Sequence, residues 1–169
     1  MRQIKINSTT GNEILTVSDV KNYVRIDTSA DDVLIGRMIT EARIYCENYI
    51  SRDIVPKNRT YYLSETSELI NIPFGPVSEI SSVTSEGNDA DYTAKGLDNE
   101  LIKLDGGSAK DVKITYVTTG LSDDLIKNAM LQFISTLYDN RADFVTGTIV
   151  ADVPTETRAL LGSYRNMFV

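Results

Sequence analysis

The stretch from Thr16 to Asn58 constrains the fold of this chain more than any other part of the sequence. Thr16 and Asp19 have the spacing of a capping box, which marks the start of a helix. Beyond Asp32, apolar residues recur every three or four positions, as they do in a helix that buries one face. We therefore expect a short and then a long helix within residues 16–55, with the long helix running to about Ile50 or Arg52. The apolar stripe of the long helix contains Leu34, Ile35, Met38, Ile39, Ala42, Tyr45, Cys46 and Tyr49.

The helical period returns in the last third of the chain. Ser122, followed by two aspartates, has the character of a helix N-terminus, and a broad apolar face follows it. We expect helix over residues 121–143, a loop over residues 144–154 and a short helix over residues 155–165. Residues 166–169 are expected to be a tail with exposed apolar side chains.

Between these helices the period of the apolar residues changes to two. Residues 59–118 contain short alternating runs separated by turn sequences such as Pro73 to Pro76, which is typical of an antiparallel sheet with one solvated face. Residues 1–15 are polar and are expected to be a loosely held arm. The predicted fold is α+β: a helical core of two long helices with short flanking helices, and an inserted small antiparallel β region. A single domain is expected over residues 16–165.

Composition narrows the possible functions. The net charge of −7 disfavours a protein that grips DNA. Its ordinary explanation is solubility, and the alternative is a surface past which DNA must slide. The single cysteine, Cys46, allows no internal disulfide and is expected to be a small buried hydrophobe. No secretion signal and no membrane span are expected, because the chain lacks a long apolar run.

The sequence offers little catalytic chemistry. It contains no histidine, which removes the usual general base and metal ligand, and it has no glycine-rich phosphate loop. Asp27, Ser29 and Asp31 have the spacing that opens a calcium loop, but the glycine and glutamate that such a loop needs are missing, so a helix cap is the better interpretation. We expect no enzyme activity, no cofactor and no metal. The acids that could pair for glycoside cleavage are Asp123, Asp124, Asp139 and Asp143.

Tyrosines cluster near the ends of the expected elements. Tyrosine suits partly hydrated contacts, because the ring packs while the hydroxyl stays in water. About half of these residues have an ordinary explanation as the boundary of one core, and the rest are expected to contact other subunits. The predicted subunit-interface residues are Tyr45, Tyr49, Tyr61, Tyr62, Tyr138 and Arg141.

Several short motifs follow one another in a recognisable order. They are Arg25-Ile-Asp27, Pro73-Phe-Gly-Pro76, Tyr116 with Gly120, and Tyr138-Asp-Asn-Arg141. In this order and spacing, the chain from Thr16 to Arg165 resembles the head–tail connector, or adaptor, proteins encoded among the head-completion genes of long-tailed phages, prophages and gene transfer agents.

The resemblance implies a structural protein of the virion neck that is assembled in the host cytoplasm. Such proteins form a ring, twelve-fold in relatives, below the portal protein. The ring extends the DNA channel, binds no specific DNA sequence and provides the platform for the stopper or tail. The C-terminal segment of such proteins docks onto the portal. Here that segment would contribute Leu160, Leu161, Tyr164, Arg165, Met167 and Phe168.

Two departures from the family pattern and two alternatives accompany this interpretation. Relatives commonly have a glycine after the first long helix, where this chain has Ser51, so the helix is expected to continue further here. Ser163 stands where relatives often have proline, so the last helix is not expected to break at the same point. One alternative is a stopper or tail-side completion protein of the same neck. The other, from a different class, is a small polysaccharide-binding or hydrolytic module.

Overall fold

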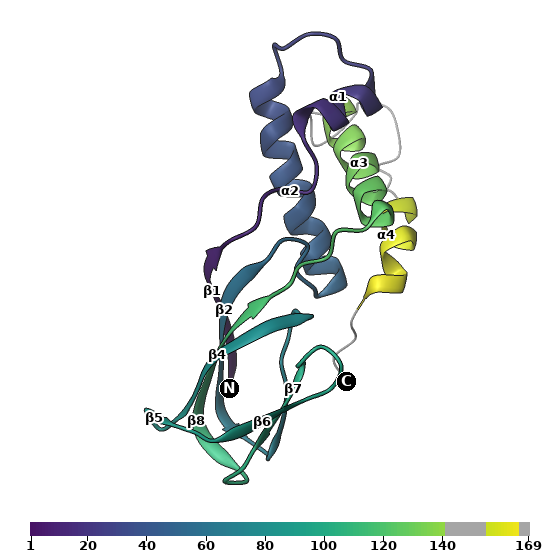
Figure 1. Cartoon of the computed structure of the whole chain (residues 1–169). Helices are drawn as coiled ribbons and strands as arrows, with labels where there is room; N and C mark the ends of the chain where they lie inside the picture. The colour runs from purple at the N-terminus through teal and green to yellow at the C-terminus, as the bar shows by residue number, and fades with distance from the viewer. Residues whose placement is uncertain (141–154, 166–169) are drawn as a thin grey trace. The chain divides into compact units, whose positions relative to one another are not determined.

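The computed structural model describes residues 1–140 and 155–165 of the chain. These residues form four α-helices, one short 3-10 helix and eight β-strands, and the chain divides into two compact units (Figure 1). We call residues 1–12 and 55–121 the β unit. The helical unit comprises residues 13–54 and the described residues from 122 onward.

The predicted fold class is wrong in its proportions. The strands form two antiparallel sheets rather than a small region inserted into a helical core. The β unit also has its own apolar core of eleven buried residues. Residues 2–9, expected to be part of a loosely held arm, form strand β1 instead. The physical reason is long-range pairing, since β1 lies beside a strand that begins about fifty residues later.

The larger sheet of the β unit has five strands in the order β1-β2-β8-β4-β5, and every neighbouring pair is antiparallel. The long central strands β2 and β8 alternate buried and half-buried side chains, as expected for a sheet with one covered face. The five strands are β1 (Arg2–Thr9), β2 (Lys57–Thr66), β8 (Ala109–Thr118), β4 (Val77–Ser85) and β5 (Asn88–Asp89).

The smaller sheet has three antiparallel strands: β3 (Leu69–Asn71), β7 (Leu101–Leu104) and β6 (Tyr92–Lys95). Side chains from both sheets meet in the core of the β unit. The core residues are Tyr61, Leu63, Ile70, Ile72, Val77, Val83, Ile102, Leu104, Val112, Ile114 and Tyr116.

The predicted turn from Pro73 to Pro76 is fixed from both sides. The buried hydroxyl of Tyr116 donates to the carbonyl oxygen of Pro73 at 2.7 Å. The guanidinium carbon of Arg59 lies 3.9 Å from the centre of the Phe74 ring. A side chain at Gly75 would meet the carboxylate of Glu100 at 2.5 Å, so the Glu100 side chain would have to move to accommodate it.

In the helical unit, helices α1 (Val17–Val24), α2 (Asp32–Ile50), α3 (Asp124–Asp139) and α4 (Thr155–Leu161) pack on one another, and the 3-10 helix η1 (Gly162–Tyr164) follows α4. The predicted apolar stripe of α2 is largely confirmed, because most of its members are buried and the rest are half-buried. Residues 144–154, expected to be a loop, and 166–169, expected to be a tail, lie outside the described residues.

Helix α1 starts as predicted. The Thr16 hydroxyl accepts from the Asp19 amide at 3.2 Å, and the Asp19 carboxylate accepts from the Thr16 amide at 2.8 Å. The capping box is therefore confirmed. The backbone hydrogen bond from Thr16 is the main cause that lowers the pKa of Asp19.

The N-terminus of α2 differs from the prediction, whereas its C-terminus agrees with it. Asp31 occupies the N-cap position but its side chain makes no capping hydrogen bond, so the helix cap expected from Asp27, Ser29 and Asp31 is not observed. The helix ends at Ile50, because Ser51 adopts a left-handed conformation with a φ of 56°. The helix therefore ends where its apolar pattern predicts, at about Ile50 or Arg52, and the further continuation expected from the missing glycine does not occur. Ser51 takes a left-handed conformation that glycine adopts more readily, at a cost that packing in the rest of the unit must offset.

Charged groups are buried inside the helical unit. Arg43 donates to Glu13 at 2.8 Å and to Glu47 at 3.0 Å, and Glu47 also accepts the Ile54 amide at 3.0 Å. This network joins the segment before α1, the middle of α2 and the chain just after α2. Cys46, one turn from Arg43, is fully buried as predicted, and burial raises its pKa to about 12.

Candidate interaction surfaces

The C-terminal helix α4 is partly core and partly surface. Leu161 has no exposed surface, and Thr157 is also fully buried. Leu160 and Tyr164 are half-exposed, and Arg165 is exposed. Of the predicted portal-binding residues that are described, these last three are accessible to a partner. Met167 and Phe168 lie outside the described residues.

Two predicted interface tyrosines on α2 hold the C-terminal segment. Tyr45 stacks on Phe133 of α3, with ring centres 4.4 Å apart, and its hydroxyl accepts from the Arg158 guanidinium at 3.1 Å. The Arg165 guanidinium carbon lies 5.5 Å from the centre of the Tyr49 ring. Such a cation–π contact is weak at an exposed site, so the Arg165 end of the segment is held loosely.

The 3-10 helix is attached to the start of α3. Asp123 caps α3 by accepting the Leu125 amide at 2.8 Å. This backbone hydrogen bond, and then a hydrogen bond from the Tyr164 hydroxyl, lower the pKa of Asp123. The same bond to Asp123 raises the pKa of Tyr164. The carboxylate therefore has a structural role at a helix N-terminus.

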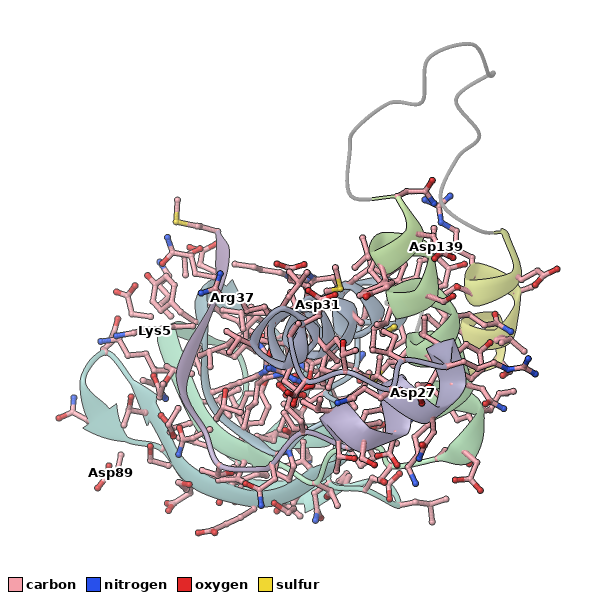
Figure 2. The ribbon with its side chains drawn as sticks, turned by 90° about the horizontal axis from the view of Figure 1, so that it is seen from above. Lys5, Asp27, Asp31, Arg37, Asp89 and Asp139 are labelled. Atoms are coloured by element: carbon pink, nitrogen blue, oxygen red, sulfur yellow. The ribbon has the colours of Figure 1, made fainter. Side chains whose placement is uncertain are left out.

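Tyr138 joins the far end of α3 to the start of α2. Its hydroxyl donates to the Asp31 carboxylate at 2.6 Å. Asp32, the next residue, forms an ion pair with Lys21 of α1 at 2.9 Å. Two of the acids between the first two helices therefore tie helices together, which fits a structural role better than a calcium site. Asp27 is exposed (Figure 2).

The tyrosines of strand β2 differ in position. Tyr61 belongs to the core of the β unit, and desolvation raises its pKa. Tyr62 points to the other face of the sheet, where its hydroxyl donates to the Asp111 carboxylate at 2.5 Å. That hydrogen bond raises the pKa of Tyr62. Of this pair, only Tyr62 presents its ring on an accessible face.

The acids weighed for glycoside cleavage do not form a described site. Asp123 is committed to its cap, and Asp124 pairs with Lys127 at 3.3 Å. Asp139 lies at the opposite end of the same helix (Figure 2). An open pocket of about 710 Å³ in the β unit has no aromatic residue in its lining, so it offers no platform for a sugar ring. Arg141 and Asp143 lie outside the described residues.

The residues that the structure describes contain no cluster of side chains suited to a metal ion. Among the same residues, no helix is long and apolar enough to cross a lipid bilayer.

Sequence reasoning missed one surface, the outer side of strand β1. All eight residues of β1 are exposed, including Ile4 at 41% and Ile6 at 49%. Among the described strands, β1 pairs only with β2, so its other side is an open edge of the sheet. The alternation of Ile4 and Ile6 with Lys5 was the available signal, because period two is typical of a strand.

Two further apolar groups are exposed on α2, Val33 at 74% and Ile44 at 47%. Residues eleven positions apart lie almost in line on a helix, so both belong to one exposed face. Arg37 and Glu41 lie between them on that face and are also exposed.

Comparison with known proteins finds one family model that matches part of this chain. Residues 14–88 match the sequence model of the phage gp6-like head-tail connector proteins. No curated protein sequence matches the chain.

Solved structures match over nearly the whole length. A chain in the neck of an empty gene transfer agent particle, computed with C6 symmetry, is 14% identical with a TM-score of 0.74. A chain in the neck of a native gene transfer agent particle, computed with C12 symmetry, is 12% identical with a TM-score of 0.75. In both cases the match covers 99% of this chain and 97% of the other. At such identity the likeness establishes a shared fold. Together with the family match, it confirms the predicted resemblance and supports a structural head–tail connector protein.

Proposed function

We propose that this chain is a neck subunit of a phage-like particle and forms a ring of identical copies below the portal protein. The ring extends the channel through which DNA passes and presents a platform for the stopper or tail. Its role is mechanical and needs no catalysis and no cofactor. The subunit is made in the host cytoplasm and joins the particle when the head is completed.

The observation that carries this proposal is the agreement of two independent comparisons. The family match covers residues 14–88, which include α1, α2 and the first part of the β unit. The structural likeness covers 99% of the chain, and the similar chains come from particle necks computed with six-fold and twelve-fold symmetry. Such rotational symmetry favours a ring of identical copies for this chain as well.

The charge of the chain supports a passage for DNA. A net charge of −7 repels a phosphate backbone, so DNA would move through a ring of such subunits without being held. A stopper or tail-side position in the same neck would have the same charge requirement, so only the binding partner separates the two assignments.

The C-terminal segment is the proposed portal contact. Leu160, Tyr164 and Arg165 are accessible, and the bonds that attach them to the helical unit are few and partly exposed. Leu161 is fully buried in the isolated unit, so its proposed contribution is to anchor α4 beneath the accessible residues. Met167 and Phe168 extend the same segment.

The test uses the full chain co-expressed with a portal protein from the same genome. Removing residues 166–169 should leave the helical unit folded and should abolish co-purification with portal. A longer deletion that removes Leu161 is a poor test, because it creates a cavity in the core and costs about 3 kcal/mol of stability.

Two point variants sharpen the experiment. Arg165→Glu should reduce co-purification with portal, whereas Glu156→Gln, on an exposed position of the same α4 helix, should not. Normal portal binding by the truncated chain would refute the docking assignment. Binding of the wild-type chain to tail proteins but not to portal would instead place it on the tail side of the neck.

A further inference from the structure

The two outer edges of the five-stranded sheet carry opposite charge. At one edge, β1 contains Arg2 and Lys5 and no acid. At the other, the segment from Val77 to Asp91, which holds β4 and β5, contains four exposed acids and no base. These acids are Glu79, Glu86, Asp89 and Asp91. We call the first the basic edge and the second the acidic edge.

The basic edge has free backbone groups in the right positions for pairing. The Met1 carbonyl accepts from the Ser64 amide at 3.0 Å, so Met1 directs its backbone groups toward β2. In an antiparallel ladder, alternate residues face the partner strand, so Ile4 and Ile6 direct their amide and carbonyl groups outward. An unpaired strand edge of this kind is a template for another strand.

The side chains of Ile4 and Ile6 also favour pairing of β1 with another strand. Ile4 lies opposite Tyr61 and Ile6 opposite Arg59, and paired residues place their side chains on the same face. Tyr61 belongs to the core, so the two isoleucines extend the apolar face beyond its last covered strand. Half-exposed isoleucines beside an open backbone are groups that a neighbouring strand would cover.

At the acidic edge, part of strand β4 has no strand paired with its outer side. Strand β5 pairs only with Thr84 and Ser85 of β4. Over the described residues no strand pairs with the outer side of β4 from Ser78 to Ser82, and four of these five residues are exposed. The fifth, Ile80, is half-buried, and its carbonyl oxygen accepts from the Tyr92 hydroxyl at 3.5 Å.

Strand directions allow the two edges to join. β1 and β8 are both antiparallel to β2, and β4 is antiparallel to β8. If a second copy lies beside the first in the same orientation, β1 of one copy runs antiparallel to β4 of the other. β1 then has the same direction as β5, which is also antiparallel to β4. This continues the antiparallel sheet without a change of pairing type.

The opposite charges of the two edges also lie on the same face of the sheet. Lys5 pairs with Thr60, which pairs with Thr115, so its side chain lies on the outer face. Glu79 pairs with Val117, two residues from Thr115 and therefore on the same face. Opposite charges thus occupy one face at the two edges. Figure 2 shows Lys5 on β1 and Asp89 near the tip of the β4–β5 hairpin, both projecting outward.

We propose that β1 of one subunit adds to the outer side of β4 in the next copy of this chain, which joins the five-stranded sheets of successive subunits. The contact uses two different surfaces of each copy, so it is heterologous and generates a ring when the rotation closes. The inference rests on the proposed function, because it supplies the contact between copies of the ring.

Charge reversal at the two edges tests the pairing directly. One variant carries Arg2→Glu with Lys5→Glu, and the other carries Glu79→Lys with Asp89→Lys. All four side chains are exposed, so both variants should unfold at the wild-type temperature. Each variant alone brings like charges together at every contact, and its incorporation into portal-containing particles should fall by about tenfold or more.

Co-expression of the two variants should restore incorporation. In an alternating ring, an acidic β1 meets a basic edge at one contact and a basic β1 meets an acidic edge at the next. The restored particles should contain both variants in equal amounts. A control, Arg25→Glu with Arg37→Glu, changes the net charge as the Arg2→Glu, Lys5→Glu variant does. Its substitutions lie at exposed positions of the helical unit, so it should be incorporated normally.

The outcomes separate this inference from the proposed function. Failure of the wild-type chain to join portal-containing particles would refute the function and, with it, the premise of the inference. Normal incorporation of both edge variants would overturn the inference alone. An equal loss in the control, or no restoration when the variants are mixed, would also overturn it.

Discussion

The two units of this chain are stabilised in different ways. The hydrophobic cluster of the β unit consists of aliphatic side chains and two tyrosines, and this unit also buries Lys57 and Arg59. The helical unit instead buries an arginine that forms ion pairs with two carboxylates. A buried ion network fixes which segments meet, because each misplaced partner leaves a charge without compensation. An apolar sheet core is less selective, and its sheet ends in open edges. The helical unit is thus specified internally, while the β unit leaves surfaces for other chains.

The largest effect should come from the core of the β unit. Ile114→Ala removes a fully buried side chain from strand β8 and should lower the free energy of unfolding by about 4 kcal/mol. Thr115→Ala is the matched control. Thr115 is the next residue of β8 and is only half-buried, so this substitution should lower the free energy of unfolding by less than about 1 kcal/mol. Chemical denaturation measures both. Equal losses would mean that the apolar core does not dominate this unit.

A slightly smaller effect is expected in the helical unit. Glu47→Ala leaves the Ile54 amide without its acceptor and removes one of the two carboxylates on Arg43, which should cost about 3 kcal/mol. Glu41→Ala, exposed on the same helix, should change stability by less than about 0.5 kcal/mol. If Glu47→Ala were neutral, the contrast between the two units would fail.

The predictable part of this fold was local. The capping box at Thr16 and Asp19 uses residues three positions apart, and the stripe of α2 follows from helical period alone. What the sequence did not disclose depends on partners that are distant along the chain. Tyr138 reaches Asp31, 107 residues away, and β1 pairs with β2 across about fifty to sixty residues. Period and propensity carry no information about such partners.

The candidate surfaces were likewise predictable only from local features. Tyrosine content identified residues at element ends, but could not tell a side chain in the core, such as Tyr61, from one on a surface, such as Tyr62. The assignment of both to subunit contacts stays a prediction. The left-handed Ser51 was also not foreseen, because serine is uncommon in that conformation and the pattern of α2 continues past it.

A modest effect is expected at the cap of α1. Thr16→Ala should lower the free energy of unfolding by about 1 kcal/mol near neutral pH. It should also move the pKa of Asp19 back toward 3.8, because Thr16 provides the hydrogen bonds that lower it. NMR titration of Asp19 measures that pKa, and Ser18→Ala, at an exposed neighbouring position, is the control.

The sign of the pH effect follows from the direction of that shift. A carboxyl with a lowered pKa in the folded state adds stability above its unfolded pKa and loses it as the pH falls through the folded value. The stability difference between wild type and Thr16→Ala should therefore shrink below pH 3.8. A difference that grows in acid would contradict the role of Asp19.

The smallest expected signal is the labelling of Cys46 by a thiol reagent in the folded protein. Burial raises the pKa of this thiol to about 12, so at pH 8 almost none of it is thiolate, and a thiol reagent should not label the folded protein. Labelling should appear only when the helical unit opens. It can therefore report whether Ile114→Ala opens the helical unit as well as the β unit. Rapid labelling of the folded wild type would mean that Cys46 is accessible.

The most direct test of a neck subunit is electron cryo-microscopy of portal-containing particles assembled with this chain. The account predicts a symmetric ring of its copies at the portal vertex, with the described fold fitting the density of each subunit and the DNA channel running through the centre. Particles that show an unoccupied portal vertex, or this chain elsewhere on the head, would contradict it.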